Sequence, residues 1–320
     1  MSGGPSHSLH SIRAEASSYV WDNSASPALE IDSGETVELE AADASGAQLG
    51  PDSTAADVAG LDFDRVNPVT GPVFVRGAKP GDVLSVEILE LRPREWGWTA
   101  IIPGFGLLAD EFPEPWLRIS EVSAGDGRVQ FADGVSLQLA PFPGTIGVAP
   151  AEPGRHSVIP PRRWGGNMDI KHLRAGSTLY LPIGVEGALF SLGDTHAAMG
   201  DAEVCGTAVE TAMDVAVRLT VRRDFTTHYP QYVVPVGQLS RSEQSSFHVC
   251  TGIHEDLLEA TREATRAMID YLVQRHGRER QEAYAIASVA VDLRIHEVVD
   301  TPNWVVGAFL PEAILTERDT

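Results

Sequence analysis

The sequence contains very little cysteine or lysine and has no long apolar run. Among its 320 residues, cysteine occurs only at Cys205 and Cys250, and lysine only at Lys79 and Lys171. Two cysteines cannot form a disulfide framework or a cysteine-rich zinc site, so packing must supply the stability. No stretch approaches the roughly 18 to 20 apolar residues that a membrane-spanning helix requires. These absences argue against a disulfide-stabilised scaffold and a helical membrane protein.

Positive charge is also scarce, with 24 basic against 45 acidic residues and a formal net charge of -21. Such a surface repels phosphate backbones and anionic lipid head groups, which argues against nucleic-acid and membrane partners. The segment Met1–His10 lacks the basic start and continuous apolar stretch of a secretory signal. We therefore expect a cytoplasmic protein whose cysteines are reduced.

Turn-forming residues are abundant, and the predicted strands between them are short. The chain has 30 glycines and 21 prolines, and its 43% hydrophobic content is enough for a sizeable core. Alternating or β-rich runs bounded by turn residues predict strands at Thr36–Leu39, Leu84–Leu91, Ser177–Leu181 and Val215–Val221. The segment Asp43–Gly60 is rich in small and polar residues and predicts a long loop.

One segment near the C-terminus has helical periodicity. Apolar residues recur with helical spacing over Ile253–Arg275, and Gly277 follows as a stop signal. An apolar stretch at Ala283–Ala290 precedes an alternating, strand-like run at Val291–Ile295.

Together these patterns predict an α+β protein that is mainly β, with a β-sandwich-like core and a smaller α/β C-terminal part. We expect residues 1–220 to form a β-rich domain that carries the functional site. Residues 221–320 would form the smaller α/β part packed on it.

The densest run of polar and glycine residues lies between Arg155 and Glu210. Asp194 and His196 are two residues apart, so in an extended segment both side chains leave the same face and can bind one cation. Asp169 could supply a third ligand, and Glu203 could act as general base beside a metal-bound water. Asp201 lies in the same short run, so Glu203 and Asp201 are the candidate catalytic carboxylates.

Several further residues could line a pocket for substrate. Asn23, Asn167 and Trp164 are candidate substrate-binding residues, although a turn with a satisfied side chain explains Asn23 equally well. An aromatic group could form a pocket wall, a subunit contact or ordinary core; its members are Trp96, Trp98, Phe105, Phe112 and Trp116. A second group, with no metal role expected, consists of His248, His254, His276 and His296.

Two other readings remain open from these residues. Cys205, Glu203 and Lys171 supply the residue types of a Cys-Glu-Lys amidase, although the apolar neighbours of Cys205 favour a structural cysteine. A non-catalytic β-sandwich binding protein with a structural cation would also fit. No Gly-x-Ser-x-Gly motif or phosphate-binding loop is present, and Gly104-Phe105-Gly106 lacks the third glycine of a dinucleotide fingerprint.

Several long motifs, in the correct order, resemble the acetamidase/formamidase family. They cover nearly the whole chain and include Trp21-Asp22-Asn23, Lys79–Asp82, Pro143–Pro150, Pro153–His156, Gly165–Asp169, Gly193–Glu203, Cys205–Glu210, Gly252–Leu257 and Asp292–Ile295. The chain departs from the family pattern at Ala202, where glycine is common, and at His254, where a small residue is expected.

The resemblance implies hydrolysis of a short aliphatic amide to ammonia and a carboxylate, on a β-rich fold, by a homo-oligomer. It also implies a divalent metal ion, for which we expect zinc, with calcium or manganese as alternatives. The positions carried over are Asn167, Asp169, Asp194, His196 and Glu203. We assign Asp169, Asp194 and His196 to the metal and Glu203 to proton transfer.

Overall fold

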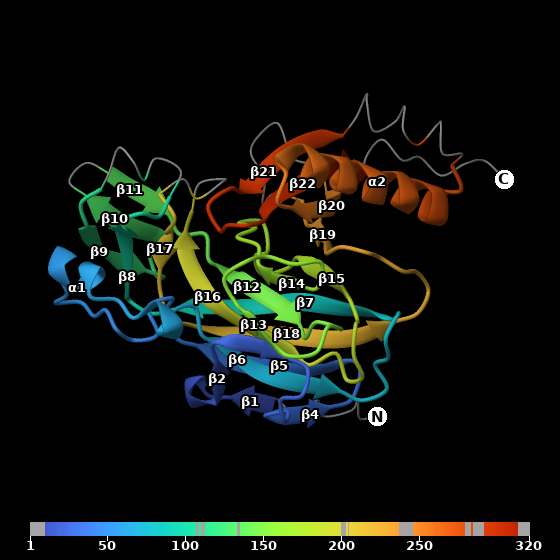
Figure 1. The fold of residues 1–320 in the computed structure, drawn as a ribbon, viewed down its shortest axis with the longest axis horizontal. Helices are drawn as coiled ribbons and strands as arrows, with labels where there is room; N and C mark the ends of the chain where they lie inside the picture. Colours follow the sequence, from blue (N-terminus) through green and yellow to red (C-terminus); the bar gives the residue numbers. More distant parts are fainter. Residues whose placement is uncertain are drawn as a thin grey trace.

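Strands make up most of this protein, and they form two large sheets packed face to face (Figure 1). The computed structural model describes residues 10–106, 109, 113–132, 135–199, 203, 205–236, 246–278, 283 and 291–312. The core between the sheets confirms the prediction of a mainly β, sandwich-like protein with few helices.

The first sheet has nine strands and runs through both halves of the sequence. In spatial order they are β1 (His10–Ile12), β5 (Glu35–Ala41), β18 (Met213–Arg222), β7 (Val83–Pro93), β15 (Thr178–Pro182), β19 (Gln231–Val234), β20 (Phe247–His254), β22 (Trp304–Pro311) and β21 (Asp292–Glu297). All five strands predicted from alternation lie in this sheet. Because it is continuous on both sides of residue 220, the division into two parts there stays a prediction.

The second sheet has eleven strands and carries the residues of interest. Its main path is β11 (Val135–Gln138), β10 (Arg128–Ala132), β9 (Trp116–Ser123), β8 (Trp96–Ile101), β17 (Val209–Glu210), β16 (Phe190–Ala198), β12 (Phe142–Val148) and β14 (Gly165–Asn167). Strand β6 (Val69–Val75) also pairs with β16 and joins β2 (Ser17–Ser18) and β4 (Leu29–Ile31). A separate ribbon pairs β3 (Val20–Asp22) with β13 (Arg155–Ser157).

The long helix α2 (Leu257–His276) packs against the nine-stranded sheet over β20 and β22 (Figure 1). The predicted start at Ile253 is wrong, because Ile253 is still in β20, paired with Val305. The helix begins after Asp256, whose carboxylate accepts a hydrogen bond of 2.9 Å from the backbone N–H of Glu259. It ends at Gly277 with φ of 59°, as predicted.

Three short helical segments complete the described elements: η1 (Ala14–Ala16), α1 (Ala55–Ala59) and η2 (Phe63–Arg65). Helix α1 falls inside the segment predicted as a loop. A capping box between Thr54 and Asp57 satisfies its first backbone donors and explains why a helical turn forms there. Within the described ranges, no helix is both long and apolar enough to cross a membrane. Apart from Ala283, the predicted apolar stretch at 283–290 lies outside the described residues.

Candidate active site

Strand β16 places Asp194 and His196 at the centre of the eleven-stranded sheet. It runs antiparallel between β12 and β6, and all nine of its residues are buried. The two side chains lie together as their spacing predicted, with Asp194 Oδ1 3.3 Å from His196 Nε2. The imidazole edge also packs against Phe142 on β12, with the ring centroids 4.9 Å apart. The histidine is therefore fixed between an acid and an aromatic ring.

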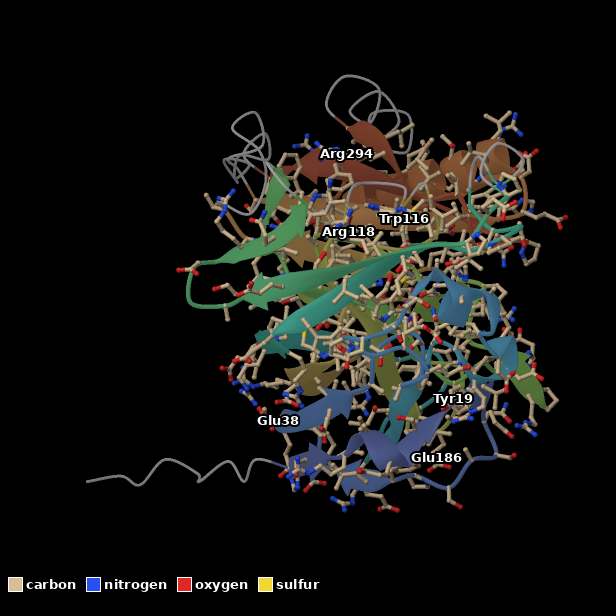
Figure 2. The ribbon with its side chains drawn as sticks, turned by 90° about the vertical axis from the view of Figure 1, so that its left-hand side faces the viewer. Tyr19, Glu38, Trp116, Arg118, Glu186 and Arg294 are labelled. Carbon is tan, nitrogen blue, oxygen red and sulfur yellow. The ribbon has the colours of Figure 1, made fainter. Side chains whose placement is uncertain are left out.

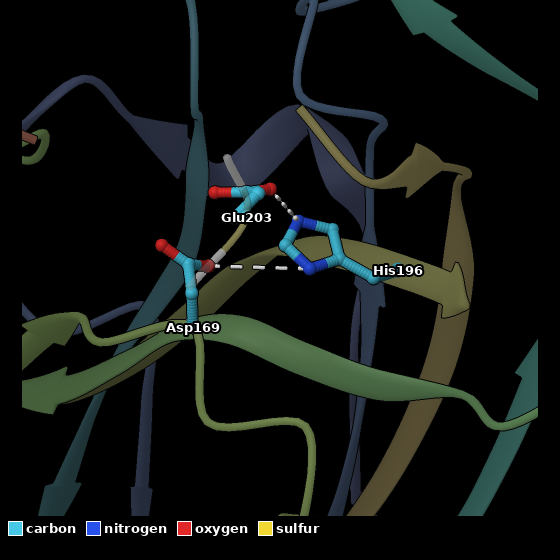
Figure 3. Close-up of side chains that lie close together, drawn as sticks. All are labelled: Asp169, His196 and Glu203. Atoms are coloured by element: carbon cyan, nitrogen blue, oxygen red, sulfur yellow. Dashed lines mark ion pairs between the residues drawn. The ribbon is translucent and has the colours of Figure 1, made fainter. Parts of the chain in front are cut away.

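Two further acids approach the two nitrogens of the same imidazole (Figure 3). Asp169, just after β14, lies with Oδ1 3.9 Å from His196 Nδ1. Glu203, in the segment after β16, lies with Oε1 3.9 Å from His196 Nε2. The structure thus brings together four of the residues singled out from the sequence, and Asn167 lies two positions before Asp169.

The backbone at three of these acids has an unusual conformation. Asp169, Asp194 and Glu203 have φ of 48°, 50° and 45°, in the left-handed region that side chains normally disfavour. Each such residue costs of order 1 kcal/mol or more, and such strain is concentrated at functional sites. Here it turns the three carboxylates towards one imidazole.

Gly144 on β12 leaves the space in which these side chains meet. A methyl group there would lie 2.4 Å from Asp169 Oδ1 and 2.7 Å from His196 Cε1. Both distances are far below van der Waals contact. Only glycine at this position is compatible with the observed arrangement.

The sequence interpretation assigned no role to three other site residues. Glu210 Oε2 lies 3.1 Å from His196 Nε2, and Glu210 Oε1 accepts a hydrogen bond of 2.7 Å from the backbone N–H of Ala208. Asp300, from the loop before β22, accepts a short hydrogen bond from Asn167 Nδ2. Thr145 donates to Asn167 Oδ1 at 2.5 Å. Glu210 was inside a family motif, but no local pattern pointed to Asp300.

The electrostatics of this region are dominated by negative charge. Six buried carboxylates surround the site: Asp169, Asp194, Glu203, Glu210, Glu297 and Asp300. Burial raises the pKa of Asp169 well above its ordinary value, and the charge of Asp194 adds to this effect. Burial also raises the pKa of Glu203 well above its ordinary value, and there the charge of Asp169 adds to the effect. Burial opposes the charged form of His196, yet Glu210 and Asp194 raise its pKa well above the ordinary value.

Several buried polar atoms of this centre have no hydrogen-bond partner. They are both carboxylate oxygens of Asp169 and Nδ1 of His196. Unpaired buried polar atoms are costly, and oxygen and nitrogen ligands in this number fit a divalent cation. Two sets of three could offer atoms within 4.8 Å of one another: Asp169, His196 and Glu203, and Asp194, His196 and Glu210. The residues present therefore fit a metal ion.

A pocket of about 170 Å³ opens onto these groups. Its polar part consists of four carboxylates, from Asp194, Glu203, Glu210 and Asp300, together with Ser45, Asn67, Asn167 and Thr207. Its apolar walls come from Leu61, Phe63, Val66, Trp98, Ile102, Phe105 and Ile159. The arrangement allows a small, partly apolar molecule to meet a buried acid and imidazole centre.

Two predicted substrate contacts lie elsewhere. The side-chain amide of Asn23 donates to the backbone carbonyls of residues 150–152, the shortest bond being 3.0 Å to Pro150. Trp164 donates from Nε1 to Glu152 at 3.0 Å and stacks with Arg163. Neither residue lines the pocket above. Asp201 lies outside the described residues.

The aromatic group divides in a similar way. Trp98 and Phe105 line the pocket. Trp116 is 38% exposed on β9, where Arg118 lies over its ring at 5.5 Å (Figure 2). Trp96 packs partly buried beside Trp98, and Phe112 lies outside the described residues.

The described contacts of Cys205 do not support a nucleophile. Its thiol donates to the backbone carbonyl of Thr207 at 3.4 Å and lies 3.7 Å from that of Ala100. It does not line the pocket, whereas its neighbours Gly206 and Thr207 do. This environment suits a structural cysteine.

Comparison with known proteins agrees with the fold and the site. The model of the Acetamidase/Formamidase family matches residues 10–157 and 154–317. The formamidase of Methylophilus methylotrophus is 27% identical over 353 residues, covering 88% of this chain and 85% of that protein. The acetamidase of Mycolicibacterium smegmatis is 26% identical over 340 residues, covering 83% of each. The crystal structure of an acetamidase from Bacillus halodurans superposes with a TM-score of 0.85 at 31% identity, covering 95% of this chain and 98% of that one.

The fold, the buried acid and imidazole centre and these similarities define an amidohydrolase that acts on linear amide C–N bonds. Within that class, the chain belongs to the acetamidase/formamidase family. The match extends over both sheets and α2, so it covers every element that builds the site.

Proposed function

We propose that this protein hydrolyses short primary aliphatic amides, of the formamide and acetamide type, to ammonia and a carboxylate. The observation that carries the proposal is the small pocket, which is lined by buried carboxylates, two of which, Asp194 and Glu210, contact the imidazole of His196. Its volume of about 170 Å³ suits a molecule of a few heavy atoms. The names of the relatives support the same substrate class.

We further propose that Asp169, Asp194 and His196 hold a divalent cation, which we expect to be zinc. The unpartnered atoms of Asp169 and His196 support this assignment. When bound, such an ion polarises the amide carbonyl and makes a water molecule acidic. One imidazole with several carboxylates also suits manganese and calcium, so metal identity is a matter for measurement.

Glu203 is the proposed proton carrier. It is buried, lines the pocket and lies beside His196. As water attacks the carbonyl carbon, Glu203 accepts a proton from it, and it returns that proton to the nitrogen as the C–N bond breaks. The products are one carboxylate and one ammonia molecule, which leaves as ammonium after protonation.

The apolar walls would set the size of the acyl group. Trp98, Ile102 and Phe105 come from β8 and the segment after it, and together they narrow the pocket opposite the acids. A longer acyl chain would have to displace these side chains. We therefore expect turnover to fall as the chain grows beyond propionamide.

Ammonia release from formamide, acetamide, propionamide and hexanamide tests this function. We expect turnover of the short amides and at least a tenfold lower kcat/KM for hexanamide. Absence of ammonia from every amide would contradict the proposal and favour a binding protein with a structural cation. Inactivation by a thiol-blocking reagent with the metal retained would instead move the chemistry to Cys205.

We also propose that the protein acts in the cytoplasm as a homo-oligomer. Strand β21 is the edge of the nine-stranded sheet, and its Leu293 and Ile295 side chains are 50% and 42% exposed. Exposed apolar residues on a sheet edge favour pairing with another chain. A monomeric mass in light scattering would contradict the oligomer. A lower mass after Leu293→Lys would place the interface at this edge.

A further inference from the structure

Carboxylates dominate the polar surface of the pocket, whose other polar side chains are Ser45, Asn67, Asn167 and Thr207. Four carboxylates line it: Asp194, Glu203, Glu210 and Asp300. Among the described lining residues there is no lysine, arginine or histidine. The Thr207 hydroxyl, which could donate, is already bonded to the carbonyl of Ala100 at 2.8 Å. Such a surface complements a ligand that brings its own N–H donors.

Asp300 is the acceptor whose position is fixed most firmly. Its backbone N–H donates to Glu297 Oε1 at 2.6 Å, and its side chain is 3% exposed. Its carboxylate accepts from Asn167 Nδ2, while Asn167 Oδ1 accepts from Thr145. Since both ends of the Asn167 amide are bonded, neither that amide nor the carboxylate of Asp300 is free to rotate.

A carboxylate can accept about four hydrogen bonds, and the bond from Asn167 uses one of them. Asp300 also lines the pocket, beside the carboxyl group of Asp169, so its lone pairs on the pocket side can meet a bound molecule. A primary amide carries two N–H groups on one nitrogen. One of them can meet Asp300 while the carbonyl faces the rest of the centre.

We propose that Asp300 is a specificity-determining residue that accepts a hydrogen bond from the substrate's amide nitrogen and selects for unsubstituted amides. This inference rests on the proposed amide hydrolysis at the same pocket. A methyl group in place of that N–H would leave the pocket-facing lone pairs of a buried carboxylate without a donor. Sites built to bond an N–H reject analogues that lack it far more strongly than sites that only exclude volume.

Asn167 has a positioning role in this scheme. Thr145 and Asn167 face each other across β12 and β14, so the sheet register fixes where the amide points. Asn167 then holds Asp300, which comes from a loop more than 130 residues away in sequence. The hydrogen bond between Asn167 and Asp300 therefore connects the loop before β22 to the second sheet, at the point where the nitrogen of the substrate would lie.

Asp300→Asn tests recognition of the substrate by Asp300 while it keeps the hydrogen bond from Asn167 that positions this side chain. The new side-chain oxygen can still accept from Asn167, but the group left to face the pocket becomes an N–H donor, which repels the donor of the substrate. Removing one charge from six buried carboxylates lowers their mutual repulsion, so the variant should fold. Asp300→Ala is a second variant that deletes the acceptor altogether. Asp214→Asn, which removes a carboxylate bonded to Arg94 on the other sheet, is the matched control.

The experiment compares kcat/KM for acetamide and N-methylacetamide in each protein and measures bound metal. We expect the unaltered protein and Asp214→Asn to prefer acetamide by about 100-fold or more. Both Asp300 variants should lose about 100-fold on acetamide and little on N-methylacetamide, with metal content unchanged. An unchanged preference would overturn the proposal. Loss of metal in both Asp300 variants would overturn it too, since Asp300 would then be a metal ligand.

Absence of turnover in the unaltered protein would reject the proposed function but not this inference. Calorimetry with the same two amides then decides the matter. Tighter binding of acetamide that disappears in Asp300→Asn supports selection by Asp300, whereas equal affinities in the unaltered protein contradict it.

Discussion

Two buried histidines on different sheets show how this molecule separates function from packing. His248 on β20 bonds to Gln231 at 3.2 Å and stacks on Tyr271 at 3.4 Å, and burial lowers its pKa to about 3. His196 on β16 is equally buried, but Glu210 and Asp194 raise its pKa. Burial alone keeps an imidazole neutral. At the site, the carboxylates of Glu210 and Asp194 reverse that preference.

The same contrast extends to the neighbouring hydrogen bonds. At α2, on the other sheet, both helix ends are capped: Asp256 caps the start and Gly277 ends the helix. At the site, atoms of Asp169 and His196 are left without hydrogen-bond partners, and three acids have strained backbones. Features that cost folding free energy are thus concentrated where chemistry needs them.

Among the changes that test this contrast, removal of the metal should have the largest effect on activity. A chelator is expected to lower ammonia release from acetamide by about 1000-fold, because stabilising charge on the carbonyl oxygen is worth several kcal/mol. Activity should return with zinc or manganese. Full activity after removal of all metal, verified by elemental analysis, would contradict the metal assignment.

Gly144→Ala tests whether the space at the site is as tight as the structure indicates. The added methyl would meet Asp169 Oδ1 and His196 Cε1, so these side chains must shift. Misplacement of this kind should lower kcat/KM about 100-fold. Gly50→Ala is the control, because a methyl there meets nothing within 4 Å. Equal activities of the two variants would show that the crowding has no functional consequence.

His248→Gln tests the structural side of the comparison, with a smaller expected effect. The pKa of this histidine is about 3 in the fold against about 6.5 when unfolded, so below pH 6.5 protons favour the unfolded chain. Between pH 6.5 and 5 this costs about 2 kcal/mol of stability. Urea unfolding at both values should show the variant losing that much less than the unaltered protein.

Exposed His228 provides the control for that measurement. His228→Gln makes the same substitution at the protein surface, and the pH dependence of unfolding is compared between the two variants. If His248→Gln left it unchanged, His248 would titrate normally in the fold, and the contrast with His196 would fail.

Local patterns in the sequence predicted much of the fold and part of the site. Alternation located β5, β7, β15, β18 and β21, because strands that are buried on one face repeat every two residues. The start of α2 was misplaced, since the apolar end of β20 is also compatible with helical spacing. Helix α1 was missed because five residues with one capping box give little periodic signal.

For the site, spacing was informative only along one strand. Asp194 and His196 could be paired from their separation, and glycines flanked Asp169. Asn167 was connected to the site by family resemblance. Asp300 and Thr145 reach it through sheet register and a loop crossing from the other end of the chain, which no local pattern encodes. Asn23 does not line the pocket in the structure, where its side-chain amide bonds to the backbone of residues 150–152.

The central claim is that Asp194 holds a metal ion while Glu203 moves a proton. Bound metal and ammonia release, measured together in Asp194→Ala and Glu203→Gln, test it most directly. The account predicts that Asp194→Ala loses metal and activity together, whereas Glu203→Gln keeps its metal and loses turnover by about 100-fold or more. Unchanged turnover in Glu203→Gln, or full metal content in Asp194→Ala, would contradict it.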